Sequence, residues 1–260
     1  MHWFRRKADD PSSPIEVTDV TDPFAILPDS VLPYVRRAYL PQTEDAPFGP
    51  GSGFGGAPHL AAGVDHPVCP SCGRPMPLLA QLAIDTLPAD ARPPGEGLIQ
   101  AFYCDGAPDD DPDSPCDTDG WQPFSKASVV RLVPAATDGR PTGEGKHPAR
   151  HVVAWEVIER DLPHWEEAQA LGIDYGDDVA AAFDDTDTQM TTGCDKLGGW
   201  PAWVQGVEYP DCPRCGQQMH MVLQIDSEDH VPVMFGDMGT GHVTQCPSHP
   251  DVLAFGWACS

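Results

Sequence analysis

The chain has 260 residues, enough for one large domain or for two domains that each bury a core. Lysine and arginine total 15 against 40 aspartates and glutamates, which gives a formal net charge of −25. A surface this acidic repels nucleic acid and anionic membranes, and it attracts basic proteins. We therefore expect no nucleic-acid or membrane partner.

The start of the chain and its hydropathy bear on its location. No apolar run reaches the roughly 20 residues that a membrane-spanning helix needs. The opening segment "MHWFRRKADDPSSP" is basic but has no apolar stretch after it, so it does not match a secretory signal. We expect a cytoplasmic protein. In a reducing compartment, its nine cysteines favour metal binding over disulfides.

The predicted elements, in chain order, begin with a polar lead-in at residues 1–22. A short amphipathic helix is expected from Pro28 or Pro33 onward, and the turn-rich stretch 41–56 should be loop. Runs of β-forming residues then predict strands over most of the remaining chain. These strands are expected at 78–84, 97–104, 127–133, 151–158, 220–225, 231–236, 241–246 and 252–258.

Helices have little room in this sequence, which contains 30 prolines. The clearest helix is predicted at 163–172, with a proline at its start and a glycine at its end. A weaker one is predicted at 177–183. The expected fold class is therefore β-rich α+β.

A repeat links two distant stretches. Residues 55–76 and 198–219 align without gaps at an offset of 143, and 11 of their 22 positions are identical. The strings "CPSCGRPM" and "CPRCGQQM" end the two stretches, and Gln81 and Gln224 extend the register. Biased composition does not place identities in one fixed frame, so the sequence predicts an internal duplication.

The cysteines follow the same repeat. Eight of the nine form two sets of four with nearly equal gaps, and Cys194 has no counterpart. We therefore expect a lead-in at 1–49, repeat one at 50–135, a linker at 136–149 and repeat two at 150–260, each repeat being a small sheet. The two sets are Cys69, Cys72, Cys104 and Cys116, and Cys212, Cys215, Cys246 and Cys259.

Each set predicts a structural zinc site. In Cys-Pro-x-Cys-Gly, two thiolates can face one ion, and the glycine allows the backbone to turn sharply. Two further cysteines close the tetrahedron and leave no open position for substrate. Iron in a similar thiolate site, disulfides or free thiols are the alternatives. His249 could replace Cys259, but the repeat favours Cys259, which has Cys116 as its counterpart.

Other motifs carry weaker signals. Aspartates cluster at 105–119 and 174–187, and neither cluster fits the frame of a calcium loop, so both are expected to be solvated. No sequence motif for a nucleophile or a phosphate loop is present. Trp200 and Trp203 are candidate partner-binding residues if they form an exposed platform, although packing in the core is the stronger expectation.

These motifs resemble a known bacterial family. "SGFGGAPHLAAG", "PMPLLAQLAI" and "GEGLIQAFYC" resemble the first half of the YwqG-like proteins, a family of unknown function. "KLGGWPAWVQG", "FGDMGTGHVTQC" and "DVLAFGWAC" resemble its second half. The resemblance covers 50–135 and 150–260. It implies a duplicated β-rich fold, with this chain in a zinc-bearing branch.

A second, weaker resemblance concerns repeat two. Its Gly-Gly-x-Pro-x-Trp turn, Cys-x-x-Cys pair and Leu-Gln strand are similar to the programmed cell death protein 2 family. Members of that family act as chaperones for a ribosomal protein. The resemblance implies a protein-binding role and no catalytic residue.

Three functions remain open on the sequence alone. The first is a non-enzymatic protein with two structural zinc ions that binds a basic protein or peptide, in a chaperone-like or immunity-like role. The second is an accessory structural zinc protein without a groove. The third is an enzyme with a dispersed acid–base site, for which the candidates are His59, His66, His147, His151 and His220. The sequence names neither the partner nor the oligomeric state.

Overall fold

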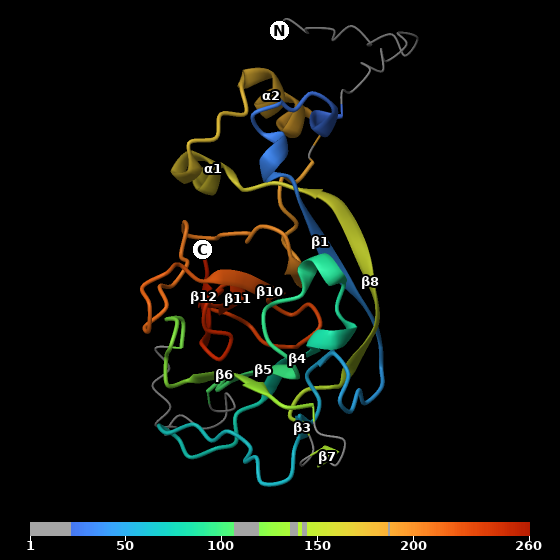
Figure 1. Cartoon of the computed structure of the whole chain (residues 1–260), viewed down its shortest axis with the longest axis vertical. Coiled ribbons are helices and arrows are strands. Elements are labelled where there is room, and N and C mark those ends of the chain that lie inside the picture. The colour runs from blue at the N-terminus through green and yellow to red at the C-terminus, as the bar shows by residue number, and fades with distance from the viewer. Residues whose placement is uncertain (1–21, 107–119, 136–139, 142–144, 187) are drawn as a thin grey trace, which may run out of the picture.

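The computed structural model describes residues 22–106, 120–135, 140–141, 145–186 and 188–260 (Figure 1). Within this part the protein is mostly β, with two short α-helices. No described helix is long and apolar enough to cross a membrane.

One antiparallel sheet of ten strands organises the described chain. Its edge strands β6 and β12 contact one another, so the sheet is nearly closed. Strands β3 (His59–Leu60) and β7 (Arg140–Pro141) form a separate pair. The order across the large sheet is β12 (Leu253–Ala258), β11 (Thr240–Gln245), β10 (His220–Asp226), β9 (Lys196–Gly198), β1 (Arg36–Glu44), β8 (Arg150–Asp161), β2 (Gly53–Phe54), β4 (Leu78–Ala83), β5 (Leu98–Tyr103) and β6 (Ser128–Val133).

The two long strands β1 and β8 lie at the centre of the order and pair with each other. Strand β1 comes early in the chain but also pairs with β9, whereas β8 also pairs with the early strand β2. Each half of the chain therefore places its long strand next to the short strands of the other half. This exchange ties the halves together through backbone hydrogen bonds.

The main core fills the space that the curved sheet encloses. Strands β4, β5 and β11 are buried at every position, because both of their faces are covered. Phe54, Phe102, Phe235 and Phe255 are fully buried in this core. Burial on both faces explains why these strands read as nearly continuous apolar runs in the sequence.

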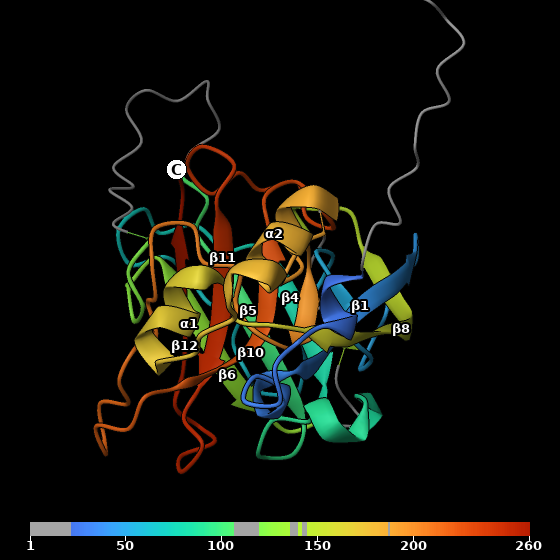
Figure 2. The same cartoon turned by 90° about the horizontal axis from the view of Figure 1, so that it is seen from above.

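A smaller unit, which we call the cap, lies over one end of the sheet (Figures 1 and 2). It consists of residues 22–35, 162–186 and 188–195, and its own core contains Val31, Leu162, Tyr175 and Phe183. It includes helices α1 (Trp165–Leu171) and α2 (Asp177–Thr186), and short 3₁₀ turns at Pro23–Ala25 and Leu32–Tyr34. Two further 3₁₀ turns, Ile84–Thr86 and Ala89–Ala91, lie beside the sheet.

Most predicted elements are confirmed. Helix α1 matches the prediction at 163–172 and ends at Gly172, whose φ of 70° is left-handed. Helix α2 matches the weaker prediction, and seven of the expected strands are present as β4, β5, β6, β8, β10, β11 and β12.

Two predictions about local structure are wrong, and a third is wrong in part. The helix expected after Pro33 is instead strand β1, because pairing with β8 and β9 outweighs local propensity. The strand expected at 231–236 is a loop whose Val231, Val233 and Phe235 are buried. Part of the expected loop at 41–56 forms the end of β1 and all of β2.

Candidate metal centres

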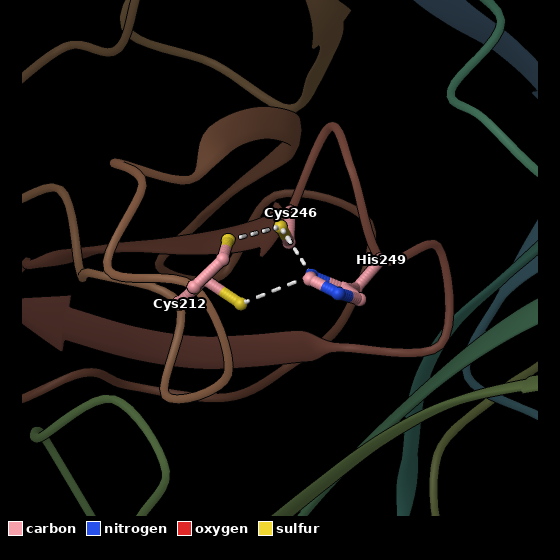
Figure 3. A group of neighbouring side chains, drawn as sticks. Cys212, Cys246 and His249 are labelled. Atoms are coloured by element: carbon pink, nitrogen blue, oxygen red, sulfur yellow. Dashed lines mark hydrogen bonds between the residues drawn. The ribbon is translucent and has the colours of Figure 1, made fainter.

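Four potential ligands meet at one point in the second half of the chain. The ligand atoms of Cys212, Cys215, Cys246 and His249 all lie within 4.8 Å of one another. His249 Nδ1 is 3.7 Å from Cys212 Sγ and 3.6 Å from Cys246 Sγ (Figure 3). The sulfurs of Cys215 and Cys246 are 3.7 Å apart.

These separations fit a tetrahedral zinc ion. Bonds of about 2.3 Å to sulfur and about 2.0–2.1 Å to nitrogen place two sulfurs roughly 3.8 Å apart and a sulfur and a nitrogen roughly 3.6 Å apart. The observed distances of 3.6 and 3.7 Å match these edges. The donor set of three thiols and one imidazole is also one that zinc accepts. The residues present therefore fit the metal.

The first half of the chain holds a related cluster of Cys69, Cys72 and Cys104. Cys72 Sγ and Cys104 Sγ are 3.7 Å apart, which is again a tetrahedral edge. The predicted fourth ligand, Cys116, lies outside the described residues.

The same local fold builds both clusters. In each Cys-x-x-Cys turn the amide of the glycine donates to the carbonyl of the first cysteine, at 2.8 Å from Gly73 and at 2.8 Å from Gly216. Both glycines have a φ of 70°, a conformation that favours glycine and allows the sharp turn. The later cysteines, Cys104 and Cys246, directly follow β5 and β11. The ends of β5 and β11 therefore place these two cysteines next to the Cys-x-x-Cys turns.

Local hydrogen bonds prepare thiols for metal binding. Burial opposes ionisation of Cys72, but hydrogen bonds from the Arg74 backbone and side chain outweigh it, and the pKa of Cys72 falls to about 6. Burial also opposes ionisation of Cys212, where the amides of Arg214 and Cys215 lower the pKa to about 6. Both groups are then largely thiolates near neutral pH, the form that binds metal.

The structure differs from the predicted ligand set at Cys259. Strands β11 and β12 are antiparallel, so Cys259, after Ala258, lies at the end of the hairpin where Thr240 begins. Cys246 lies at the other end, and a six-residue strand spans about 20 Å. His249 takes the fourth place instead. The sequence signal for this ligand is the Cys-x-x-His spacing of Cys246 and His249 directly after a strand, although the repeat favours Cys259.

Trp200 and Trp203 do not form the exposed platform considered above. They are 4% and 8% exposed. The indole N–H of Trp200 donates to the Tyr34 carbonyl at 2.7 Å, and that of Trp203 donates to the buried Glu167 at 2.9 Å. Both residues therefore join the cap to the sheet. The expectation that they pack in the core is confirmed.

The histidines considered for an acid–base site lie on separate elements. His59 is on β3, His151 on β8 and His220 on β10. His147 Nε2 is 3.5 Å from the Asp105 carboxylate, while burial lowers the pKa of His147 despite that neighbour. His59, His151 and His220 belong to neither of the two cysteine clusters.

A third group of potential ligands, Asp195, Asp229 and His230, forms a hydrogen-bonded cluster. His230 Nδ1 is 3.0 Å from Asp195 and 3.3 Å from Asp229. Burial disfavours the imidazolium, but the two carboxylates outweigh it and raise the pKa of His230 to about 9. Burial raises the pKa of Asp195 to about 6, which offsets part of the stabilisation. Because His230 Nδ1 already contacts both carboxylates, we interpret this group as an ion pair.

The cluster predicts a pH dependence of stability. Because the pKa of His230 is raised from 6.5 to about 9, its contribution is full below the unfolded-state value and is lost as the pH rises through about 9. The difference in unfolding free energy between the native chain and His230→Gln should therefore shrink between about pH 7 and about pH 10. Urea unfolding at both pH values measures it. A difference that stays constant would show that His230 does not titrate in this range.

The sequence comparisons match a region that includes both Cys-x-x-Cys turns. Residues 52–247 match the family described as "domain of unknown function (DUF1963)". The chain, a β protein with two cysteine clusters, belongs to this family. YwqG-like proteins carry this domain, so the predicted resemblance is confirmed at that level.

One curated relative is similar over a short stretch. The "uncharacterized protein YpfL" of Salmonella typhimurium (strain LT2) is 48% identical over 40 residues. The match covers 15% of this chain and 9% of the relative. The stretch is therefore a small part of either protein.

Proposed function

We propose that the protein binds two structural zinc ions and uses the folded scaffold to bind a basic protein partner. The observation that carries the zinc part is the set of tetrahedral separations among Cys212, Cys215, Cys246 and His249. The first site uses Cys69, Cys72 and Cys104, with Cys116 as its predicted fourth ligand.

The ligand positions favour a structural role over a catalytic one. Four protein ligands fill the tetrahedron and leave no position for water or substrate. Each site joins the turn before one strand, β4 or β10, to the end of the next, β5 or β11. A bound ion would therefore hold β4 against β5, or β10 against β11, and its binding free energy would contribute to folding.

We infer that the two halves arose by duplication, with the zinc sites as repeated features. The side chains of Gln81 and Gln224 support this, since each donates two hydrogen bonds to backbone carbonyls and accepts one from a backbone amide. All three pairs of partners are 143 residues apart, although two of the pairs lie outside the aligned stretches. The partners are Gly49, Gly51 and His59 for Gln81, and Thr192, Cys194 and Ala202 for Gln224.

The net charge of −25 supports a basic partner. Residues 162–195, which supply most of the cap, contain nine aspartates and glutamates and no lysine or arginine, although Glu167 and Asp195 among them are buried. A chaperone-like or immunity-like role fits this chemistry. Immobilised protein at low salt is expected to retain basic proteins and to release them as salt rises. Retention that does not depend on the charge of the retained protein would contradict the partner part of the proposal.

X-ray absorption at the zinc edge tests the ligand sets. The native chain should show sulfur at about 2.3 Å and a minor nitrogen contribution at about 2.0–2.1 Å. His249→Ala should remove the outer-shell scattering of the imidazole ring, because His249 is the proposed nitrogen ligand. Cys259→Ser is the matched control and should leave the spectrum unchanged. The reverse pattern, with an effect of Cys259→Ser alone, would restore the ligand set predicted from the repeat.

A further inference from the structure

A cavity of about 450 Å³ lies between the cap and the loop that follows β9. Its aromatic lining comes from three side chains, Trp165 on α1, Phe183 on α2 and Trp203 before β10. Asp184, which is exposed, and His164 add polar groups to the lining. The volume falls in the range of roughly 300–1,000 Å³ that ligand pockets in proteins have.

Two of the aromatic walls are held in place by other side chains. Trp165 packs edge-on against Tyr175, with ring centroids 5.1 Å apart. Trp203 donates its N–H to Glu167 and packs against Tyr209 at 4.8 Å. Fixed indole rings need no ordering when a ligand binds, which favours affinity.

The charge around the cavity selects the ligand class. No lysine or arginine is among the described residues that line the cavity, and Lys196, which follows this segment, is fully buried and paired with Asp161 at 3.2 Å. Asp184 has no ion pair among the described residues. The Nδ1 atom of His164 is buried without a hydrogen-bond partner in the same part of the chain. A carboxylate beside indole faces suits a cation, which tryptophan attracts through its ring electrons.

The position of the cap in the fold adds a second argument. The connection from β1 to β2 covers residues 45–52, whereas the corresponding connection from β8 to β9 covers residues 162–195. The cavity is therefore built by a long segment present in one half of an otherwise similar sheet. Such a segment is not needed to complete the sheet, since the short connection serves the same purpose in the other half.

We propose that this cavity receives a lysine or arginine side chain from a basic segment of the partner protein. The cation lies against Trp165 and Trp203 and pairs with Asp184. This inference rests on the proposed function, because it assigns the site at which the basic partner is recognised.

Fluorescence anisotropy with short labelled peptides tests the assignment. The probes are an arginine-containing peptide and the same peptide with neutral citrulline in place of each arginine, titrated with the full-length, zinc-loaded protein. The native protein should bind the arginine peptide and prefer it over the citrulline peptide. Asp184→Asn and Trp165→Leu should each weaken binding of the arginine peptide by about fivefold.

Matched controls separate the cavity from the general acidity of the surface. Asp65→Asn removes the same charge from an exposed loop after β3, and Trp121→Leu removes an exposed indole outside the cavity. Neither control should change affinity by more than about twofold, since general charge effects are small per residue. Circular dichroism confirms that each variant is folded, and Asp184→Asn alters only an exposed side chain.

The outcomes separate the two proposals. Binding of the arginine peptide that Asp184→Asn and Asp65→Asn weaken equally, with no effect of Trp165→Leu, would overturn the cavity and leave the basic partner in place. No binding of either peptide by the native protein at low salt would count against the basic partner itself. The zinc sites are tested independently of both results.

Discussion

Replacing Cys246 with serine is expected to release one zinc ion and to destabilise the protein strongly. Cys246 is fully buried, and its sulfur contacts both Cys215 Sγ and His249 Nδ1. Without this thiolate the turn at 212–215 loses its link to the end of β11. Losses of metal sites reach about 4 kcal/mol or more, which for a chain of this size lowers the melting temperature by roughly 10 °C.

Cys194→Ser is the matched control for that experiment. Cys194 is partly buried but belongs to neither cluster, so this variant should keep both ions and nearly the native melting temperature. Thermal unfolding with zinc analysis of the same samples gives both readouts. Equal melting temperatures for Cys246→Ser and Cys194→Ser would mean that the second cluster does not stabilise the fold through a metal.

Removing the carboxylate of Asp161 is expected to have a comparably large effect. Asp161 and Lys196 form an ion pair in which both side chains are fully buried. The carboxylate also accepts hydrogen bonds from the amides of Thr192 and Trp200, at 3.0 and 2.6 Å. Asp161→Ala leaves the ammonium of Lys196 buried without its counter-ion, which costs about 3–5 kcal/mol.

The double variant Asp161→Leu/Lys196→Met distinguishes a buried charge from lost packing. If the uncompensated charge of Lys196 causes the loss, the double variant should be more stable than Asp161→Ala in urea unfolding. A double variant that is no more stable than Asp161→Ala would show that the unpaired ammonium of Lys196 is not the cause of the loss.

The sequence signal is clearest for strands that are buried on both faces, although β6 and β8, which are partly exposed, are also predicted. Strands β4 and β5 are buried at all positions, so their residues form apolar runs that are visible without any tertiary information. Strand β1 was missed because its burial is irregular and its partners β8 and β9 lie more than 100 residues away. Short strands such as β2 and β9 have too few residues to show a period.

The candidate sites were predictable to a similar extent. The two Cys-x-x-Cys turns and the cysteines after β5 and β11 were identified from the repeat, and the structure brings these six residues into two clusters. The fourth place in the second cluster depends on the antiparallel β11–β12 hairpin, which carries Cys259 away and leaves His249 close. The spacing of residues in the sequence does not show that β11 and β12 run antiparallel. The burial of Trp200 depends in the same way on contacts with residues distant in sequence.

Elemental analysis of untagged protein, purified without added metal, shows whether the two cysteine clusters bind zinc. We expect about two zinc ions per chain, one for each cysteine cluster. Protein that is folded and free of metal, with its cluster cysteines open to a thiol reagent, would contradict this expectation. A redox or disulfide role for the two Cys-x-x-Cys turns would then replace it.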